Sequence, residues 1–156
     1  MPTIITNTPF CLIPKELLIE EKIQEYWHTL YPTPENINIG KDEMENFFLL
    51  YPKPNDMEAI HEISFLYNSL QEKKSNNECM IGMSLYENRF FVLALKNLNI
   101  AYSGYFYYTE KEDILYHLTN ISHHFFDRAA PVIFYYQHLP VACLRFLNQY
   151  FEINKI

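Results

Sequence analysis

One stretch in the second half of the chain gathers side chains that bind metal ions in other proteins. His117, His123, His124 and Asp127 lie on a segment that the sequence predicts to be a helix. At about 100° per residue, His117 and His124 share one flank, and Asp127 lies one turn beyond His124. His117, His124 and Asp127 are therefore candidate metal ligands. The alternative is a solvated helix flank with C-terminal histidines, which the lack of an H-E-x-x-H pattern favours.

The sequence gives little indication of a nucleophilic catalytic pair or of a cofactor-binding loop. His138 and Cys143 form a conceivable base and nucleophile, but no acidic residue nearby would orient the histidine, so a buried thiol is the better interpretation. The three glycines (Gly40, Gly82 and Gly104) are too scattered for a loop that cradles phosphate. No catalytic residue and no cofactor are predicted, and an enzymatic role is disfavoured.

Aromatic residues are unusually dense in two segments of the second half. The chain has 13 Tyr and 12 Phe, and Tyr102, Tyr105, Tyr107 and Tyr135 lie in runs that read as strands. Side chains alternate between the two faces of a strand, so part of this set faces outward unless helices cover both faces of the sheet. Tyrosine is favoured at protein interfaces. A partner surface and helix-covered packing are both open interpretations.

The bulk composition limits the partners. Among 156 residues, 19 acidic side chains outnumber 12 basic ones, and the net charge of −7 disfavours nucleic acid. No apolar run is long enough to cross a bilayer, and the N-terminus lacks the pattern of a signal peptide. Three widely separated cysteines (Cys11, Cys79 and Cys143) show neither zinc nor disulfide spacing. We therefore expect a cytoplasmic protein with no membrane partner.

The first half reads as a partial α/β lobe. Strands are predicted at residues 10–13, 37–44 and 46–51, and a helix at residues 15–30 carries one apolar stripe. A short helix at 55–62 and a strand at 64–67 are predicted next. The polar residues 71–78 are typical of a loop, which sets the expected domains at 1–76 and 77–156.

The second half gives the strongest signal. Runs at 79–86, 89–96 and 100–108, joined by short polar connections, predict a three-stranded antiparallel meander. Thr109 and Glu112 have the spacing of a capping box, and the helix that follows extends to about residue 127. A strand at 131–136 and a helix at 140–151 complete a β-β-β-α-β-α order, which is typical of an α/β fold with a mixed sheet.

These segments resemble an uncharacterised bacterial family, domain of unknown function 3822. The resemblance rests on PFCLIPKEL at residues 9–17, NRFFVLAL at 88–95, SGYFYY at 103–108 and DILYHL at 113–118. That family is similar in fold to the actin, Hsp70 and sugar-kinase superfamily, whose halves are ribonuclease H-like units. The resemblance implies an incomplete actin-like ATPase fold that starts at the fourth strand of the first half and lacks the last strand and helix of the second.

The resemblance carries over no nucleotide site. Superfamily members hold nucleotide with an acidic residue and glycines in the first hairpin of each half, in the style of Asp-x-Gly-Thr. The matching residues 83–89, MSLYENR, have neither that Asp nor a Gly. The leading hypothesis is a non-catalytic interaction or scaffold protein with an unknown protein partner or self-association. The alternatives are a nucleotide-binding ATPase or kinase-like protein, and a metal-binding protein using the helix histidines.

Overall fold

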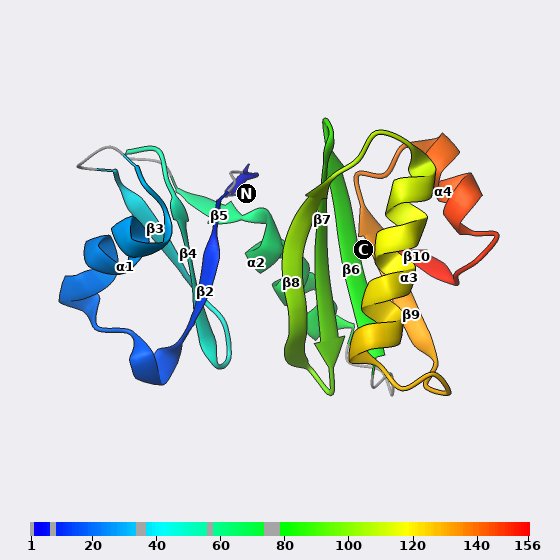
Figure 1. Cartoon of the computed structure of the whole chain (residues 1–156), viewed down its shortest axis with the longest axis horizontal. Helices are drawn as coiled ribbons and strands as arrows, with labels where there is room; N and C mark the ends of the chain where they lie inside the picture. The colour runs from blue at the N-terminus through cyan, green and yellow to red at the C-terminus, as the bar shows by residue number, and fades with distance from the viewer. Residues whose placement is uncertain (1, 7–8, 34–36, 56–57, 74–78) are drawn as a thin grey trace. The chain divides into compact units, whose positions relative to one another are not determined.

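A computed structural model describes residues 2–6, 9–33, 37–55, 58–73 and 79–156 (Figure 1). The chain divides into two compact units, Met1–Phe65 and Leu66–Ile156. The division falls within helix α2 (Glu62–Glu72), ahead of the predicted boundary between residues 76 and 77. From Leu66 onward this helix packs on the sheet of the second unit, where Leu66 and Leu70 lie against Gly82.

The first unit contains two small sheets. Strands β2 (Cys11–Pro14), β4 (Phe47–Pro52) and β3 (Ile39–Glu43) pair antiparallel in the order β2-β4-β3, which confirms the strands predicted at 10–13, 37–44 and 46–51. Strands β1 (Thr3–Ile5) and β5 (Ala59–His61) form a separate parallel pair.

The predicted helix at 15–30 is correct only in its second half. It is divided into the 3-10 turns η1 (Lys15–Leu17) and η2 (Glu20–Lys22) and helix α1 (Ile23–Leu30). Leu18 and Ile19 between the turns are extended, with ψ of 124° and 115°. The side chain of Trp27 anchors α1, because it is fully buried and its ring lies 4.7 Å from that of Tyr31.

Two predictions around residue 60 are wrong. Residues 59–61 of the predicted helix form strand β5, and residues 64–67 of the predicted strand lie in helix α2. Ile63, Leu66 and Leu70 are fully buried at the i, i+3 and i+7 spacing of a helix, a period that the short window 64–67 is too brief to reveal. Residues 56–57 and most of the predicted loop, 74–78, lie outside the described residues.

The second unit is built on one five-stranded sheet in the order β10-β9-β6-β7-β8. Strands β6 (Cys79–Tyr86), β7 (Arg89–Lys96) and β8 (Asn99–Tyr107) form the predicted antiparallel meander, and β9 (Val132–Gln137) is parallel to β6. Strand β10 (Ile153–Lys155), parallel to β9, corrects the expectation that the last strand is missing. Its three residues are too few to show an alternating pattern in the sequence.

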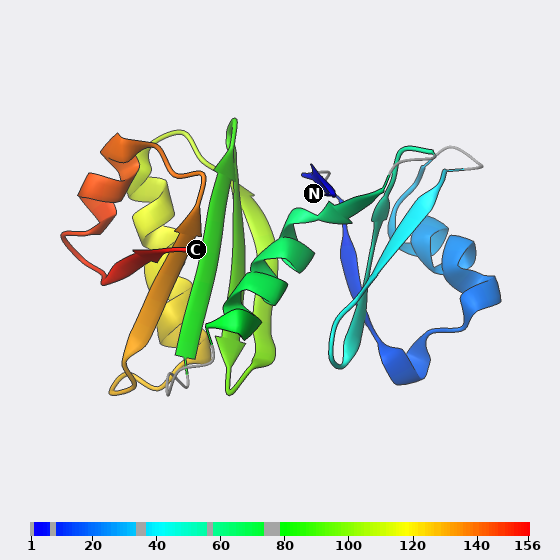
Figure 2. The ribbon, with the colours of Figure 1, turned by 180° about the vertical axis from the view of Figure 1, so that it is seen from behind.

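Helices cover both faces of this sheet. Helix α3 (Lys111–Phe125) and helix α4 (Val141–Leu147) lie on one face, and α2 lies across the other, as Figures 1 and 2 show from opposite sides. The main core fills the space between the sheet and α3 and includes Ile81, Phe90, Val92, Ile114 and Leu118, all fully buried. Two-sided burial explains why β6 and β7 read as nearly continuous apolar runs.

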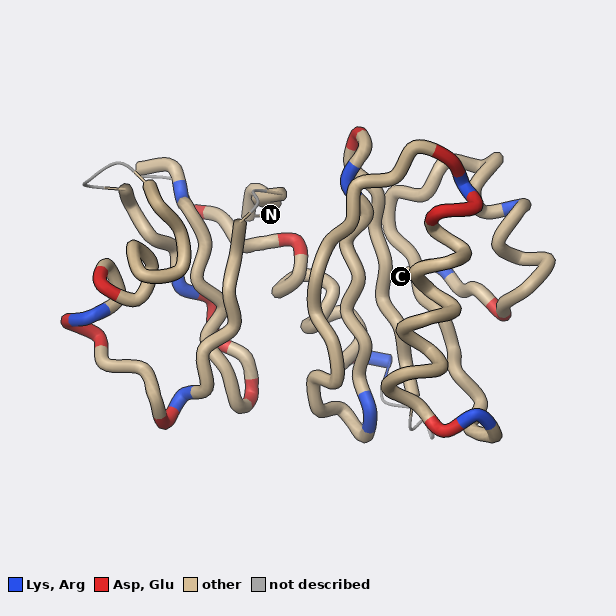
Figure 3. The backbone as a smooth tube through the Cα atoms, viewed as in Figure 1, with Lys and Arg blue, Asp and Glu red and all other residues tan. Residues whose placement is uncertain are grey.

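The start of α3 is capped one residue later than predicted. The N-cap is Glu110, and the Asp113 carboxylate accepts hydrogen bonds from the backbone N–H groups of Thr109 (2.9 Å) and Glu110 (3.1 Å). Thr109 and Glu112 are therefore not the capping pair. The two backbone hydrogen bonds lower the pKa of Asp113. Figure 3 shows the acidic residues gathered at this end of α3, where they complement the helix dipole.

A buried polar cluster ties three strands of the first unit together. The Tyr51 hydroxyl on β4 donates to the Asp42 carboxylate on β3 (2.9 Å) and lies 3.1 Å from the carbonyl oxygen of Ala59 on β5. The same carboxylate accepts a hydrogen bond from the backbone N–H of His61 (2.8 Å). Gly40 makes room for the ring, since a Cβ there would lie 2.7 Å from Cζ of Tyr51.

We expect Gly40→Ala to lower the free energy of unfolding of the first unit by about 1–3 kcal/mol, the usual cost of overpacking. Tyr51 is fully buried and hydrogen-bonded, so its ring cannot move aside. Gly82→Ala is the matched control. Its Cβ would meet the end of the flexible Leu70 side chain at 3.0 Å, so the cost is smaller. Chemical denaturation followed by circular dichroism measures both, and equal costs would contradict the prediction.

Candidate functional site

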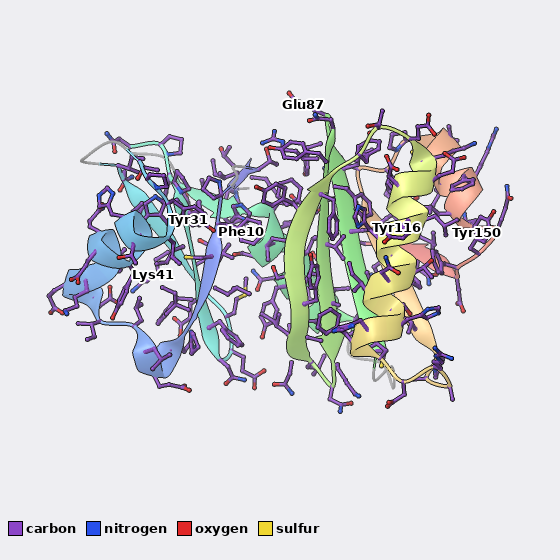
Figure 4. All side chains as sticks on the ribbon, in the orientation of Figure 1. Phe10, Tyr31, Lys41, Glu87, Tyr116 and Tyr150 are labelled. Carbon is purple, nitrogen blue, oxygen red and sulfur yellow. The ribbon has the colours of Figure 1, made fainter. Side chains whose placement is uncertain are left out.

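The β6–β7 hairpin is the place where the resemblance would locate a nucleotide. Its strands pair up to Tyr86 and Arg89, which leaves a tight turn of Glu87 and Asn88 (Figure 4). The Tyr108 hydroxyl donates to the carbonyl oxygen of Glu87, and the Tyr108 N–H to that of Asn88, both at 3.1 Å. The Glu87 carboxylate lies 3.5 Å from the Arg89 guanidinium. Both carbonyl oxygens of the turn and its one carboxylate therefore interact with groups of the protein itself; we call this turn closed.

Near the carboxyl ends of the parallel strands β6 and β9 lie two uncharged polar residues. Ser84 and Gln137 are register partners there, next to the hairpin. The Oγ of Ser84 and the Oε1 of Gln137 are buried and, within the described part of the chain, have no hydrogen-bond partner. In open α/β sheets these strand ends are where ligands bind. A magnesium–phosphate group prefers carboxylate ligands, which Ser84 and Gln137 do not provide.

The second unit also contains a groove lined by aromatic and histidine side chains. It lies between α3 and the edge strand β8 and has a volume of about 430 Å³. Tyr102, Phe106 and Phe125 contribute aromatic rings, and His117, Asn120, His123 and His124 contribute polar groups. The groove therefore brings together residues from the predicted tyrosine surface and the predicted histidine cluster.

Gly104 shapes the wall of this groove. A Cβ on Gly104 would collide with the Tyr102 ring, whose Cζ lies 2.9 Å from that position. The ring of Tyr102 thus lies along β8 over the glycine and is parallel to the Phe106 ring, with a 6.2 Å separation and an interplanar angle of 3°. Burial raises the pKa of Tyr102. No sequence pattern predicts this packing, because it depends on a side chain folding back over its own strand.

Each of the three metal candidates contacts a different side chain. The His117 ring is stacked on that of Phe106 at 3.8 Å, and the His124 ring lies edge-on to Phe125 at 4.9 Å. The Asp127 carboxylate lies 3.4 Å from the Lys96 ammonium. Across the described residues, no group of three or more His, Cys, Asp or Glu side chains is placed to hold a metal ion.

The four predicted interaction tyrosines do not share one surface. Tyr102 lies on the α3 side of the sheet, whereas Tyr105 contacts Phe91 and Tyr107 on the other side (6.1 and 5.8 Å). Tyr107 is the most accessible, with 62% of its surface exposed. Tyr135 is buried, with 7% exposed, because it packs within the sheet next to Gly82, so it offers no surface to a partner.

Cys143 and His138, considered as a nucleophile and base, contact different groups. The Cys143 side chain packs against the core of the second unit, and burial raises its pKa. The His138 ring instead contacts Tyr86 (5.3 Å) and lies within hydrogen-bond distance of the Gln137 amide (3.0 Å). A protonated thiol is a poor nucleophile, so this pair has no activated member.

Comparisons with known proteins identify the fold. No family model matches the chain, and no curated protein is similar to it in sequence. A crystal structure from Bacteroides thetaiotaomicron, described as a protein with actin-like ATPase fold and unknown function, superposes with a TM-score of 0.77. The chain has an actin-like ATPase fold. The alignment covers 98% of this chain at 12% identity, but only 66% of the Bacteroides chain.

This similarity confirms the fold class predicted from the sequence. With so low an identity it extends to the fold alone, and the family named from the sequence stays a prediction. Among the described residues, no helix is long and apolar enough to cross a membrane.

We expect the Cys11 thiol to resist alkylation. Burial raises its pKa from 9.0 to about 11, so the reactive thiolate is about a hundredfold scarcer near neutral pH and becomes abundant only as the pH approaches that value. Peptide mass spectrometry after iodoacetamide treatment of the native protein measures the rate. Denatured protein is the control, in which Cys11, Cys79 and Cys143 react alike. A native Cys11 that reacts as fast as a small thiol would contradict the prediction.

Proposed function

We propose that this chain is a non-catalytic interaction protein built on a degenerate actin-like ATPase fold. The single observation that carries the proposal is the closed β6–β7 turn. Its carbonyl oxygens accept hydrogen bonds from Tyr108, and its one carboxylate pairs with Arg89. A phosphate-binding hairpin needs exposed backbone N–H groups and close approach, for which glycine is suited. The proposal includes kinship with domain of unknown function 3822 and a place in the bacterial cytoplasm.

The side chains of Ser84 and Gln137 support the same proposal. Catalysis of phosphoryl transfer depends on a bound metal ion and on a group that orients the attacking oxygen. Ser84 and Gln137 occupy the strand ends where such groups would be placed, and neither side chain carries a charge. Ser84 is fully buried, which fits packing rather than contact with a ligand.

The partner surface that we propose is the edge of the sheet at β8. This strand is the last of the five in the second unit, and its end carries the exposed Tyr107 ring. An edge strand presents backbone groups that another chain can pair with, and tyrosine adds a large contact area with a polar tip. The occupant is a protein partner or a second copy of the chain.

The second candidate function is a nucleotide-binding ATPase, which the fold itself favours. We expect MgATP at millimolar concentration to leave the free energy of unfolding unchanged. A ligand present at 100 times its Kd would raise that free energy by about 2.7 kcal/mol. Thermal denaturation with MgATP, with MgCl₂ at equal ionic strength as the control, makes the measurement. A saturable increase specific to MgATP would overturn the non-catalytic proposal.

We expect Tyr107→Ser to reduce partner capture from a lysate of the native host, or self-association by light scattering, by about tenfold, a typical loss for an interface tyrosine. Tyr150→Ser is the matched control, since Tyr150 is similarly exposed at 55% but follows α4. Equal capture by both variants would place the surface elsewhere. Absence of any partner, together with a monomeric mass at high concentration, would count against the interaction role.

A further inference from the structure

We propose that the groove between α3 and β8 binds a small molecule in which an aromatic ring carries a carboxylate. All its lining residues belong to the second unit. Its volume of about 430 Å³ falls within the roughly 300–1,000 Å³ that ligand pockets span. The groove adjoins the β8 edge proposed above as the partner surface, but Tyr102 and Phe106 face α3, whereas Tyr105 and Tyr107 lie on the other side of the sheet.

The apolar part of the groove suits a flat ring. Tyr102 and Phe106 present parallel rings from one strand, and Phe125 closes the wall from α3 with its ring 5.4 Å from that of Tyr102. His117 already stacks on Phe106 at 3.8 Å and 10°, so the groove holds one planar group against this wall within the protein itself. Offset stacking of a further ring would bury apolar surface that is now half exposed.

The polar part of the groove suits an anion. His117, Asn120, His123 and His124 offer N–H donors, and none of the lining residues is acidic, although the chain carries 19 acidic side chains against 12 basic ones. Figure 3 shows Asp, Glu, Lys and Arg residues at the start of α3 and just beyond its end, whereas the rest of the helix and β8 carry none. A carboxylate thus meets donors without a competing negative charge.

The other ionisable groups near the histidines lie at the ends of α3, on β7 and on β8. On α3, Asp113 accepts two backbone hydrogen bonds at the helix start, and the exposed Tyr116 ring lies 5.4 Å from that of His117. At the other end of α3, Asp127 pairs with Lys96 of β7. On β8, burial raises the pKa of Tyr102, so that hydroxyl stays neutral. The histidines and Asn120 are therefore the polar lining groups that can donate an N–H to an anion.

The test compares 2-naphthoate with 2-naphthamide, which has the same ring and no charge. Titration of the full chain is followed by ¹H–¹⁵N NMR, which reports where each probe binds. We expect shifts in the residues of the groove and a Kd for naphthoate at least about tenfold lower than for naphthamide, as a charge-assisted hydrogen bond implies.

Variants separate the ring contact from the charge contact. The double variant His123→Gln with His124→Gln removes two exposed imidazoles, so it should weaken naphthoate binding several-fold and leave naphthamide binding unchanged. His28→Gln in the first unit is the control and should change neither. Equal affinities for the two probes, shifts outside the groove, or indifference to the double variant would each overturn the proposal.

Discussion

Strand β6 is hydrogen-bonded along both edges and buried on both faces, and the second unit is assembled around it. One edge pairs antiparallel with β7 over the whole strand, and the other pairs parallel with β9. Ile81 and Met83 point into the core beneath α3, while Gly82 admits Leu66 and Leu70 of α2 on the other face. A strand shared in this way fixes the register of both neighbours. The position of the hairpin turn, the strand ends and the groove follows from that register.

The sequence predicted the second unit better than the first for a physical reason. The meander strands are long, apolar on both faces and joined by short turns, so each signal is strong and local. The wrong predictions concern segments of few residues. Strands β5 and β10 have three residues each, and the helix at 15–30 is interrupted at Leu18 and Ile19, whose backbone is extended. The sequence indicated the candidate histidines and tyrosines by residue type. Their position in one groove depends on the packing of α3 beside β8, which hydrophobic periodicity cannot show.

The three glycines of this chain all lie where a bulky side chain packs closely on a strand. Gly40 lies beneath the Tyr51 ring, Gly104 beneath the Tyr102 ring, and Gly82 beneath two leucines of α2. None of the three has a positive φ, whereas Glu87, Asn97 and Leu98 in the hairpin turns do. The chain therefore places glycine where bulky side chains pack closely on a strand, and leaves tight turns to residues that are strained there. A phosphate-binding loop would need the opposite distribution.

The single tryptophan has a spectroscopic consequence. Trp27 lies fully buried in the first unit, whereas the second unit holds only tyrosine and phenylalanine as aromatic chromophores of its own, together with histidine. Emission excited at the red edge of the absorption band therefore comes from one half of the chain, while the amide circular dichroism signal comes from both. The protein carries an internal label that distinguishes the melting of one unit from that of the other without any chemical modification.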